Sequence, residues 1–271
     1  MSDSLKTGQF YGEPQRRVEM AGVVLTEVAH TCGRKLPRHT HESAYFGLLL
    51  GGSYSEKCTG RATEYRPFTM GFHPAALTHS DEVGACGSRM FCVELRKDYM
   101  ERTRALLSAP RFVPDLCGSE ATWLGLRLYR SFADVGLDPL QLEELCGSML
   151  EHVASRNVAA ETGLPAWLNR ALELLHESFR DSLTLEGIAL QVGVHPIHLS
   201  RVFRRRHGCT MAEYLNRLRV QRVCQELQSG QEDLAYLAAE SGFADQSHMG
   251  RVFKSCTGQT PAQFRRFFRA S

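Results

Sequence analysis

The sequence lacks the features that would assign it to a membrane, secreted or disulfide-rich class. No apolar run approaches the roughly 20 residues that a membrane-spanning helix needs. The first residues, MSDSLKTGQFYGEPQRR, contain no apolar stretch of the signal-peptide type. The nine cysteines are scattered and form no CxxC pair, which argues against a disulfide framework or a cysteine-rich zinc site. These absences predict a cytoplasmic protein that has no membrane partner.

An excess of one charge is also missing, because the formal net charge is only +2. The charge is nevertheless unevenly distributed along the chain. Residues 165–271 hold 14 Lys and Arg against 10 Asp and Glu, whereas residues 1–164 hold 18 against 20. A basic C-terminal part beside a mildly acidic N-terminal part indicates a nucleic-acid-binding module attached to a second domain.

The spacing of apolar residues divides the chain into a β part and helical parts. Residues 18–95 contain short apolar runs such as VVLTEVA and YFGLLL, separated by Gly, Pro and Ser, which is typical of an antiparallel sandwich or barrel. From residue 98 onward, apolar residues recur three or four apart, as in helices. We therefore expect an α+β protein with four parts: a β-barrel domain at 1–98, a helical region at 99–156, a linker at 157–164 and an all-α domain at 165–271.

The helical region at 99–156 has strongly apolar faces. Some of this surface must cover the barrel, and some is a candidate for pairing with a second chain in a homodimer. Packing within one chain is the equally simple alternative. The residues concerned are Trp123, Leu126, Leu128, Leu140, Leu142, Leu145 and Leu150.

The C-terminal part contains an internal repeat, in which residues 185–214 correspond to residues 234–264. Gly193 corresponds to Gly242 at an offset of 49, and the tripeptide Arg-Val-Phe at 201–203 recurs at 251–253 at an offset of 50. The second copy therefore has one extra residue between the glycine and the tripeptide. Two copies in register are hard to obtain by chance, so the repeat defines two structural units.

Each copy has the pattern of a helix-turn-helix unit. A small residue, alanine in both copies, lets a second helix approach the first closely. Gly193 or Gly242 follows four residues later, where the chain must leave the first helix, and we expect a positive φ there. Pro196 suits the first turn of one second helix, and Asp245 can cap the other.

The exposed face of each second helix carries side chains that can read DNA. Arg can bond guanine, Gln can pair with adenine, and Ile can touch a thymine methyl group. A small helical bundle with a solvated basic face is the alternative, and the duplicated pattern favours binding of double-stranded DNA. The candidate base readers are Ile197, Ser200 and Arg201 in the first unit and Gln246, Ser247, His248 and Arg251 in the second, whereas Arg204 and Arg205 are candidates for phosphate contacts.

Residues 165–268 resemble the AraC/XylS family of bacterial transcription regulators. The resemblance rests on the A-x-x-x-G pattern of each copy and on the segment SGFADQSHMGRVFKSCTGQTPAQFR, which ends in G-x-T-P-x-x-F-R. It implies two subdomains joined by one long helix at about residues 210–228, with the recognition helices in successive major grooves ~34 Å apart. It also implies that RNA polymerase is a partner and that the second unit reads bases less directly, as Gly250 suggests.

The same family commonly places a cupin-like β-barrel sensor before the DNA-binding part, and residues 18–95 fit this expectation. The segment GRKLPRHTHESAYFGLLLGG resembles the first cupin motif, and His79 stands near the place of the histidine in the second motif. Residues two apart on a strand point to the same side, so His39 and His41 are both expected to face the barrel interior. The three histidines are the candidate ligand-binding residues and the candidate metal set.

The match departs from metal-binding cupins at one position. Those proteins have a glutamate three or four residues after the second histidine, where this chain has Tyr45 and Phe46. Glu42 is adjacent to His41, so on a strand its side chain points the other way. We interpret His73 as structural and Tyr45 as part of the core. We therefore expect no cofactor, with a metal in the barrel as the alternative.

The function that these patterns favour is a sequence-specific, DNA-binding transcription regulator that responds to a small-molecule effector in the barrel. No catalytic residue is assigned, and the protein is not expected to be an enzyme. Two alternatives stay open. The first is a cupin-type, metal-dependent oxygenase with a DNA-binding tail, and the second is a regulator that needs no ligand and whose barrel is purely structural.

Overall fold

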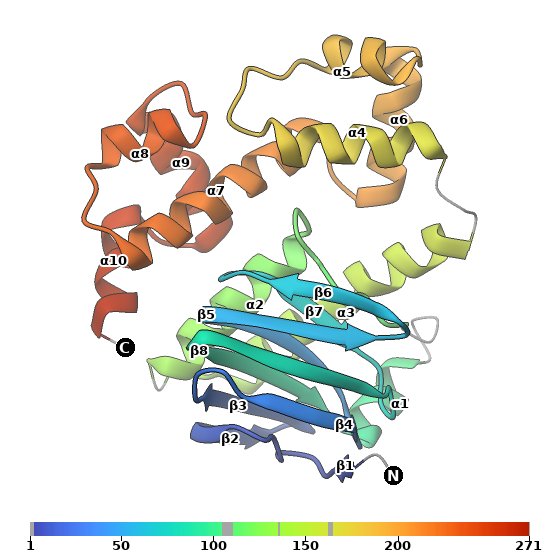
Figure 1. Ribbon diagram of the computed structural model, residues 1–271, viewed down its shortest axis with the longest axis vertical. Coiled ribbons are helices and arrows are strands. Elements are labelled where there is room, and N and C mark those ends of the chain that lie inside the picture. Colours follow the sequence, from blue (N-terminus) through green and yellow to red (C-terminus); the bar gives the residue numbers. More distant parts are fainter. Residues whose placement is uncertain (1–2, 105–110, 135, 162–164, 271) are drawn as a thin grey trace. The chain divides into compact units, whose positions relative to one another are not determined.

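The computed structural model describes residues 3–104, 111–134, 136–161 and 165–270. The chain divides into two compact units, one made of Met1–Leu116 with Leu124–Ala154 and the other of Cys117–Trp123 with Ser155–Ser271. Strands are confined to the first unit, and the second is helical, which confirms the predicted α+β class (Figure 1). Within the described ranges, no helix combines the length and apolar character needed to cross a bilayer.

The first unit is built on one sheet. Over the residues that the structure describes, the strands are β1 (Asp3–Leu5), β2 (Glu13–Met20), β3 (Val23–His30), β4 (Lys35–His41), β5 (Ala44–Cys58), β6 (Arg61–Tyr65), β7 (Met70–His73) and β8 (His79–Leu95). Their order is β1-β4-β8-β3-β2, and β5 pairs with β6, β7 and β8. All pairs are antiparallel except β1 with β4.

The sheet of the predicted cupin-like domain forms a half-barrel. Among the described strands, no ladder joins β2 to β6 or β7, so the sheet stays open between these edge strands. The β structure also begins before residue 18, because β1 and the first half of β2 precede it. Both segments are short or polar and lack the apolar alternation that identifies a strand in a sequence.

Strand β8 organises the sheet because it is long enough to pair with three others. Its second half pairs with β3 and β5, and its first half with β4 and β5. Helix α2 (Glu120–Ala133) covers part of this strand, since the Tyr129 and Phe132 rings lie 5.3 and 5.2 Å from the Phe91 ring. These three aromatic side chains are almost fully buried and join helix and sheet into one core.

Two further helices, α1 (Lys97–Arg104) and α3 (Pro139–Glu161), belong to the region expected at 99–156. Of the apolar residues assigned to its faces, only Leu140 is largely exposed, at 75%, and the others are buried. Their burial supports packing within the chain. Helix α3 continues through the predicted linker as far as Glu161, and residues 162–164 lie outside the described ranges. The segment RNVAAE contains no Gly or Pro, and Ala and Glu favour helix over linker.

The second unit contains the two predicted helix-turn-helix units. Its helices are α4 (Ala166–Glu177), α5 (Leu185–Val192), α6 (Pro196–His207), α7 (Met211–Ser229), α8 (Leu234–Glu240), α9 (Gln246–Thr257) and α10 (Pro261–Ala270). Helix α7 is the long connecting helix expected at about 210–228, and it packs against helices of both helix-turn-helix units (Figure 1). A capping box starts it, in which Thr210 and Glu213 bond each other's backbone N–H groups.

The turns have the predicted backbone geometry. Gly193 has a φ of 71° and Gly242 a φ of 81°, a region that glycine adopts without steric cost. Ala189 and Ala238 are buried where the first helix of each unit meets the second. The repeat in the sequence therefore corresponds to a repeat in the fold.

Alanine substitutions at two glycines of the helical unit are predicted to change the stability of the protein in opposite directions. Gly193→Ala should lower the free energy of unfolding by about 1–2 kcal/mol, because a Cβ is strained at positive φ. Gly250→Ala should raise it by about 0.5–1 kcal/mol, because Gly250 lies inside α9 and a Cβ there meets nothing within 4 Å. Urea unfolding of the full chain, followed by far-ultraviolet circular dichroism, measures both. Effects of the same sign would contradict this prediction.

Candidate DNA interface and buried histidine cluster

In the first helix-turn-helix unit, the second helix is α6, which has one buried and one exposed face. Leu199 and Phe203 are fully buried in the core formed by α4 to α7. On the opposite face, Ile197 is 73% exposed and Arg201 is exposed. An exposed apolar side chain at this position is free to contact the methyl group of a thymine. The remaining candidates also lie off the core: Ser200 is half-buried, and Arg204 and Arg205 are exposed.

The corresponding helix α9 has the same arrangement. Met249 and Phe253 are buried, and Asp245 caps the helix by accepting a 2.7 Å hydrogen bond from the backbone N–H of His248. Among the candidates, Gln246, Ser247 and Arg251 are exposed, and His248 is half-buried with its ring 5.5 Å from that of Phe243. The geometry is compatible with every predicted base contact, and each assignment stays a prediction.

A buried arginine links the two helix-turn-helix units. Arg219, on α7, is 9% exposed, and its guanidinium donates hydrogen bonds of 2.7 and 2.9 Å to the carbonyl oxygens of Phe179 and Asp181. Both acceptors lie in the segment between α4 and α5. The same guanidinium lies 5.9 Å from the centre of the Phe243 ring, in the turn of the second unit. Arg219 thus contacts the loop of one unit and the turn of the other.

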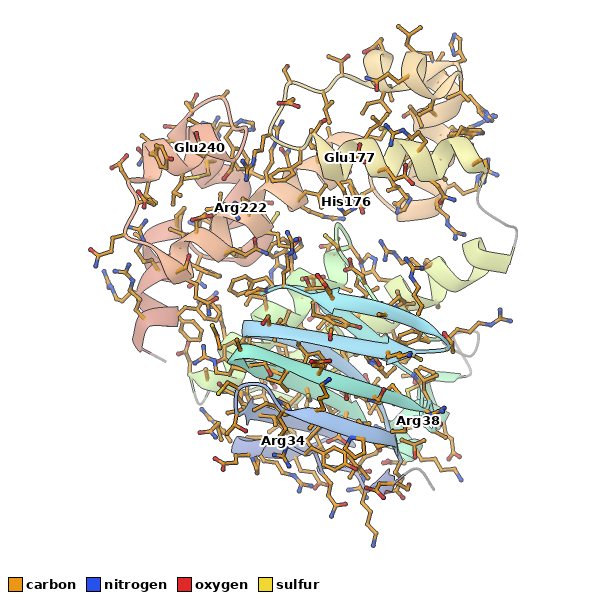
Figure 2. The ribbon with its side chains drawn as sticks, in the orientation of Figure 1. Arg34, Arg38, His176, Glu177, Arg222 and Glu240 are labelled. Carbon is orange, nitrogen blue, oxygen red and sulfur yellow. The ribbon has the colours of Figure 1, made fainter. Side chains whose placement is uncertain are left out.

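Two other contacts join separate segments of the same helical unit. A Cβ at Gly242 would lie 2.6 Å from the carbonyl oxygen of Arg180, so the turn of the second unit approaches the α4–α5 segment as closely as backbone allows. In the first helix-turn-helix unit, His176 of α4, labelled in Figure 2, has its Nε2 2.9 Å from the hydroxyl of Tyr214 on α7. The sequence analysis missed Arg219, because an arginine in an amphipathic helix is normally exposed.

The three candidate histidines of the N-terminal unit come together, as their spacing predicted. His39 stands directly opposite His79 in the β4–β8 ladder, and His41 follows on the same face of β4. The ring centroids of His39 lie 4.2 Å from His79 and 5.1 Å from His41. One ring nitrogen of each histidine lies within 4.8 Å of the others, and all three residues are at most 4% exposed.

Two carboxylates that the sequence analysis did not single out complete the cluster. Glu56 on β5 and Asp81 on β8 are paired in register and are 2% and 5% exposed. Asp81 lies two residues after His79, so both side chains share one face of the strand. No motif marks Glu56, since only the pairing of β5 with β8 brings it to Asp81.

The two carboxylates differ in their hydrogen bonds. Glu56 is fully engaged, because Tyr65 donates to one of its oxygens at 2.9 Å and the Nε2 of His73 lies 2.7 Å from the other. Among the described residues, neither oxygen of Asp81 accepts a hydrogen bond of normal geometry, although the Tyr54 hydroxyl interacts with it. His73 and Tyr45, interpreted from the sequence as structural and core residues, both belong to this polar cluster, and their rings stack at 4.4 Å.

The electrostatics of the cluster follow from burial. Loss of hydration lowers the pKa of His39, and with repulsion from neighbouring histidines it lowers the pKa of His41 to about 2 and of His79 to about 3. Burial and the nearby Glu56 raise the pKa of Asp81 to about 8. Burial also opposes ionisation of Glu56, yet its pKa is lowered because His73 outweighs that effect. Burial therefore favours the neutral forms of His39, His41, His79 and Asp81, whereas Glu56 is ionised.

Glu42 lies as the sequence indicated, exposed and directed away from the histidines, where it accepts a 3.2 Å hydrogen bond from the backbone N–H of Thr7. The position that carries a glutamate in metal-binding cupins is thus occupied by Tyr45, whose hydroxyl lies 3.3 Å from the Nε2 of His79. The carboxylate absent from β5 near His41 is matched by one on β8, at Asp81.

Comparisons with known proteins identify the helical unit. Residues 168–266 match a family described as "Helix-turn-helix domain". The probable transcription factor PqrA of Proteus vulgaris is 30% identical over 99 residues, which are 36% of this chain and 77% of that protein. The bifunctional transcriptional activator/DNA repair enzyme AdaA of Bacillus subtilis is 32% identical over 99 residues, and this chain spans only 47% of its length.

Among solved structures, the C-terminal domain of AraT, a response regulator from Geobacillus stearothermophilus, matches with 27% identity and a TM-score of 0.38 over 39% of this chain and 88% of that one. The family match over residues 168–266 falls on the part of the chain that carries the repeat and helices α6, α7 and α9. This protein belongs to the AraC/XylS family of transcription regulators.

Proposed function

We propose that this chain is a sequence-specific, DNA-binding transcription regulator. The observation that carries the proposal is the pair of helices α6 and α9, which each bury an apolar face and expose a polar one while sharing α7 as their support. Such helices dock in the major groove. The AdaA relative is itself named a transcriptional activator, which supports the same function here. RNA polymerase, a second copy of this chain and a cytoplasmic location are further parts of this proposal.

The experiment that tests this function is selection of DNA by the full-length chain. The chain is incubated with a library of random duplexes, and bound duplexes are amplified and sequenced. We expect enrichment of a site with two half-sites about one helical turn apart, because α6 and α9 would read successive major grooves. A chain that is folded by circular dichroism and enriches no sequence would contradict the proposal.

Arg201→Ala should weaken binding to the selected site by about 1–3 kcal/mol and relax the preference at one base pair. The reason is the exposed position of Arg201 on the first turns of α6, where a guanidinium can bond a guanine edge. Fluorescence anisotropy with the selected duplex and with its single-base variants measures both effects.

Arg205→Ala is the matched control, since it removes the same group further along the exposed side of α6. It should weaken binding to specific and random duplexes alike and reduce the dependence of affinity on salt, as loss of a phosphate contact does. If Arg201→Ala produced the same uniform loss, Arg201 would be a phosphate contact rather than a base reader.

We further propose that the regulator responds to a small effector that binds at His39, His41 and His79. Buried polar groups without partners are costly for a fold and are typical of ligand sites. The histidine cluster supplies neutral nitrogen donors, which suit a metal ion, an acidic metabolite or a polyhydroxylated ligand.

A panel of divalent metal ions, organic acids and sugars, screened by thermal shift, tests the effector site. An effector at about 100 times its Kd stabilises the native state by about 2.7 kcal/mol. The triple variant His39→Ala, His41→Ala and His79→Ala should lose this gain and still bind the selected DNA. His30→Ala removes a buried histidine elsewhere in the half-barrel and should keep the gain. An undiminished response in the folded triple variant would exclude these histidines as the effector site.

A further inference from the structure

The strongest unexplained feature of the molecule is the Asp81 carboxylate. It is buried beside His39 and His79, and among the described residues neither oxygen accepts a hydrogen bond of normal geometry, although the Tyr54 hydroxyl interacts with it. Buried ionised carboxylates in proteins are paired with other groups or coordinate metal ions. We propose that His39, His41, His79 and Asp81 bind one divalent transition-metal ion, an inference that rests on the proposed effector site.

In two of the histidines, a hydrogen bond from Nδ1 favours the tautomer whose Nε2 can bind a metal ion. The Nδ1 of His39 lies 2.9 Å from the carbonyl oxygen of Pro37, and the Nδ1 of His79 lies 3.3 Å from that of Leu77. A neutral imidazole that donates from Nδ1 to a carbonyl carries its lone pair on Nε2. Histidines that bind metals characteristically make this second hydrogen bond to a backbone carbonyl or a carboxylate. Both rings therefore present Nε2 as the donor atom.

The distances between donor atoms match a coordination sphere better than a hydrogen-bonded network. The Oδ2 of Asp81 lies 3.7 Å from the Nε2 of His39 and 3.8 Å from the Nε2 of His79, which is too long for hydrogen bonds. Ligands held ~2.0–2.2 Å from a tetrahedral ion are ~3.3–3.6 Å apart, so small side-chain movements would close the site. The Nδ1 of His41 has no hydrogen-bond partner in the described part of the chain and is available as the remaining nitrogen.

The donor set also indicates which metal is preferred. Three imidazoles and one carboxylate suit Zn²⁺ and the neighbouring first-row ions, whereas Ca²⁺ and Mg²⁺ require mostly oxygen ligands. Glu56 lies beside this donor set, and its two oxygens are already hydrogen-bonded by Tyr65 and His73. It is therefore assigned to the surroundings of the site rather than to coordination. Asp81 thus supplies, from β8, the carboxylate that the sequence lacks after His41.

The test measures Zn²⁺ binding to the full-length chain after chelator treatment, by equilibrium dialysis and metal analysis. We expect one Zn²⁺ per wild-type chain, loss of that ion in the double variant His39→Gln and His79→Gln, and at least tenfold weaker binding in Asp81→Asn. The matched controls are His30→Gln and Glu94→Gln. They change a buried histidine and a buried carboxylate of the same half-barrel outside the cluster and should bind as the wild type does.

Substitution with Co²⁺ identifies the ligands in the wild-type protein, so the proposal stays testable even where a variant does not fold. A four-coordinate site of nitrogen and oxygen donors gives strong visible absorption without a thiolate charge-transfer band. A thiolate band would place the metal at the cysteines and overturn the proposal, as would a folded wild-type chain that binds no more Zn²⁺ than the double variant. Wild-type affinity and an unchanged Co²⁺ spectrum in Asp81→Asn would remove Asp81 from the site.

Binding of the selected DNA by the same samples separates this inference from the proposed function. If Zn²⁺ binds but no duplex is retained, the metal site stands and the regulator proposal fails. If the duplex is retained by a protein that binds no Zn²⁺, the regulator stands and the metal site is excluded. Weaker DNA binding by metal-free wild-type protein, restored by Zn²⁺ but not in Asp81→Asn, supports both and makes the ion the effector.

Discussion

Helix α7 is the element on which the geometry of the C-terminal unit depends. It has 19 residues and so is about 28 Å long, which is close to one turn of duplex DNA. Because both helix-turn-helix units pack on it, the separation of α6 and α9 follows from the length of a rigid rod rather than from a flexible connection. Arg219 adds a second constraint, since its guanidinium bonds the loop of the first unit and lies beside the turn of the second.

The close approach of the α4–α5 segment explains why the turn of the second helix-turn-helix unit needs glycine at 242. The backbone of Arg180 approaches that turn so closely that a Cβ would overlap its carbonyl oxygen. Gly242 therefore meets two requirements, a positive φ and a close approach, whereas Gly193 meets only the first. The two copies of the repeat share their pattern, but tertiary packing has made the second glycine the more constrained.

The N-terminal half-barrel solves a different problem, because it holds many polar groups in a site from which water is excluded. Four histidines, two carboxylates and two tyrosines come together there on strands β4, β5, β6, β7 and β8. Most of these groups form hydrogen bonds with each other, whereas among the described residues Asp81 accepts none of normal geometry. An apolar filling would stabilise the fold more, since buried polar groups without partners cost free energy. Such a cost is typical of a site that binds something.

The sequence by itself determined the features that depend on local patterns. The α+β class, the two helix-turn-helix units, α7, the positive φ at Gly193 and Gly242 and the shared face of His39 and His41 all follow from residue spacing within one element or one repeat. Helix and strand periods are local properties, so they can be recognised without knowing the fold. The end of α3 was misjudged because a polar segment without Gly or Pro can continue a helix.

Only the tertiary structure decided which distant side chains meet. Glu56 faces Asp81 because β5 and β8 pair over most of their length, and His73 reaches Glu56 because β7 pairs with the other half of β5. No spacing in the sequence encodes these registers, and an acidic residue on a half-buried strand is usually solvated. The open edge of the half-barrel and the burial of Arg219 likewise depend on contacts between segments far apart in the chain, which local patterns do not specify.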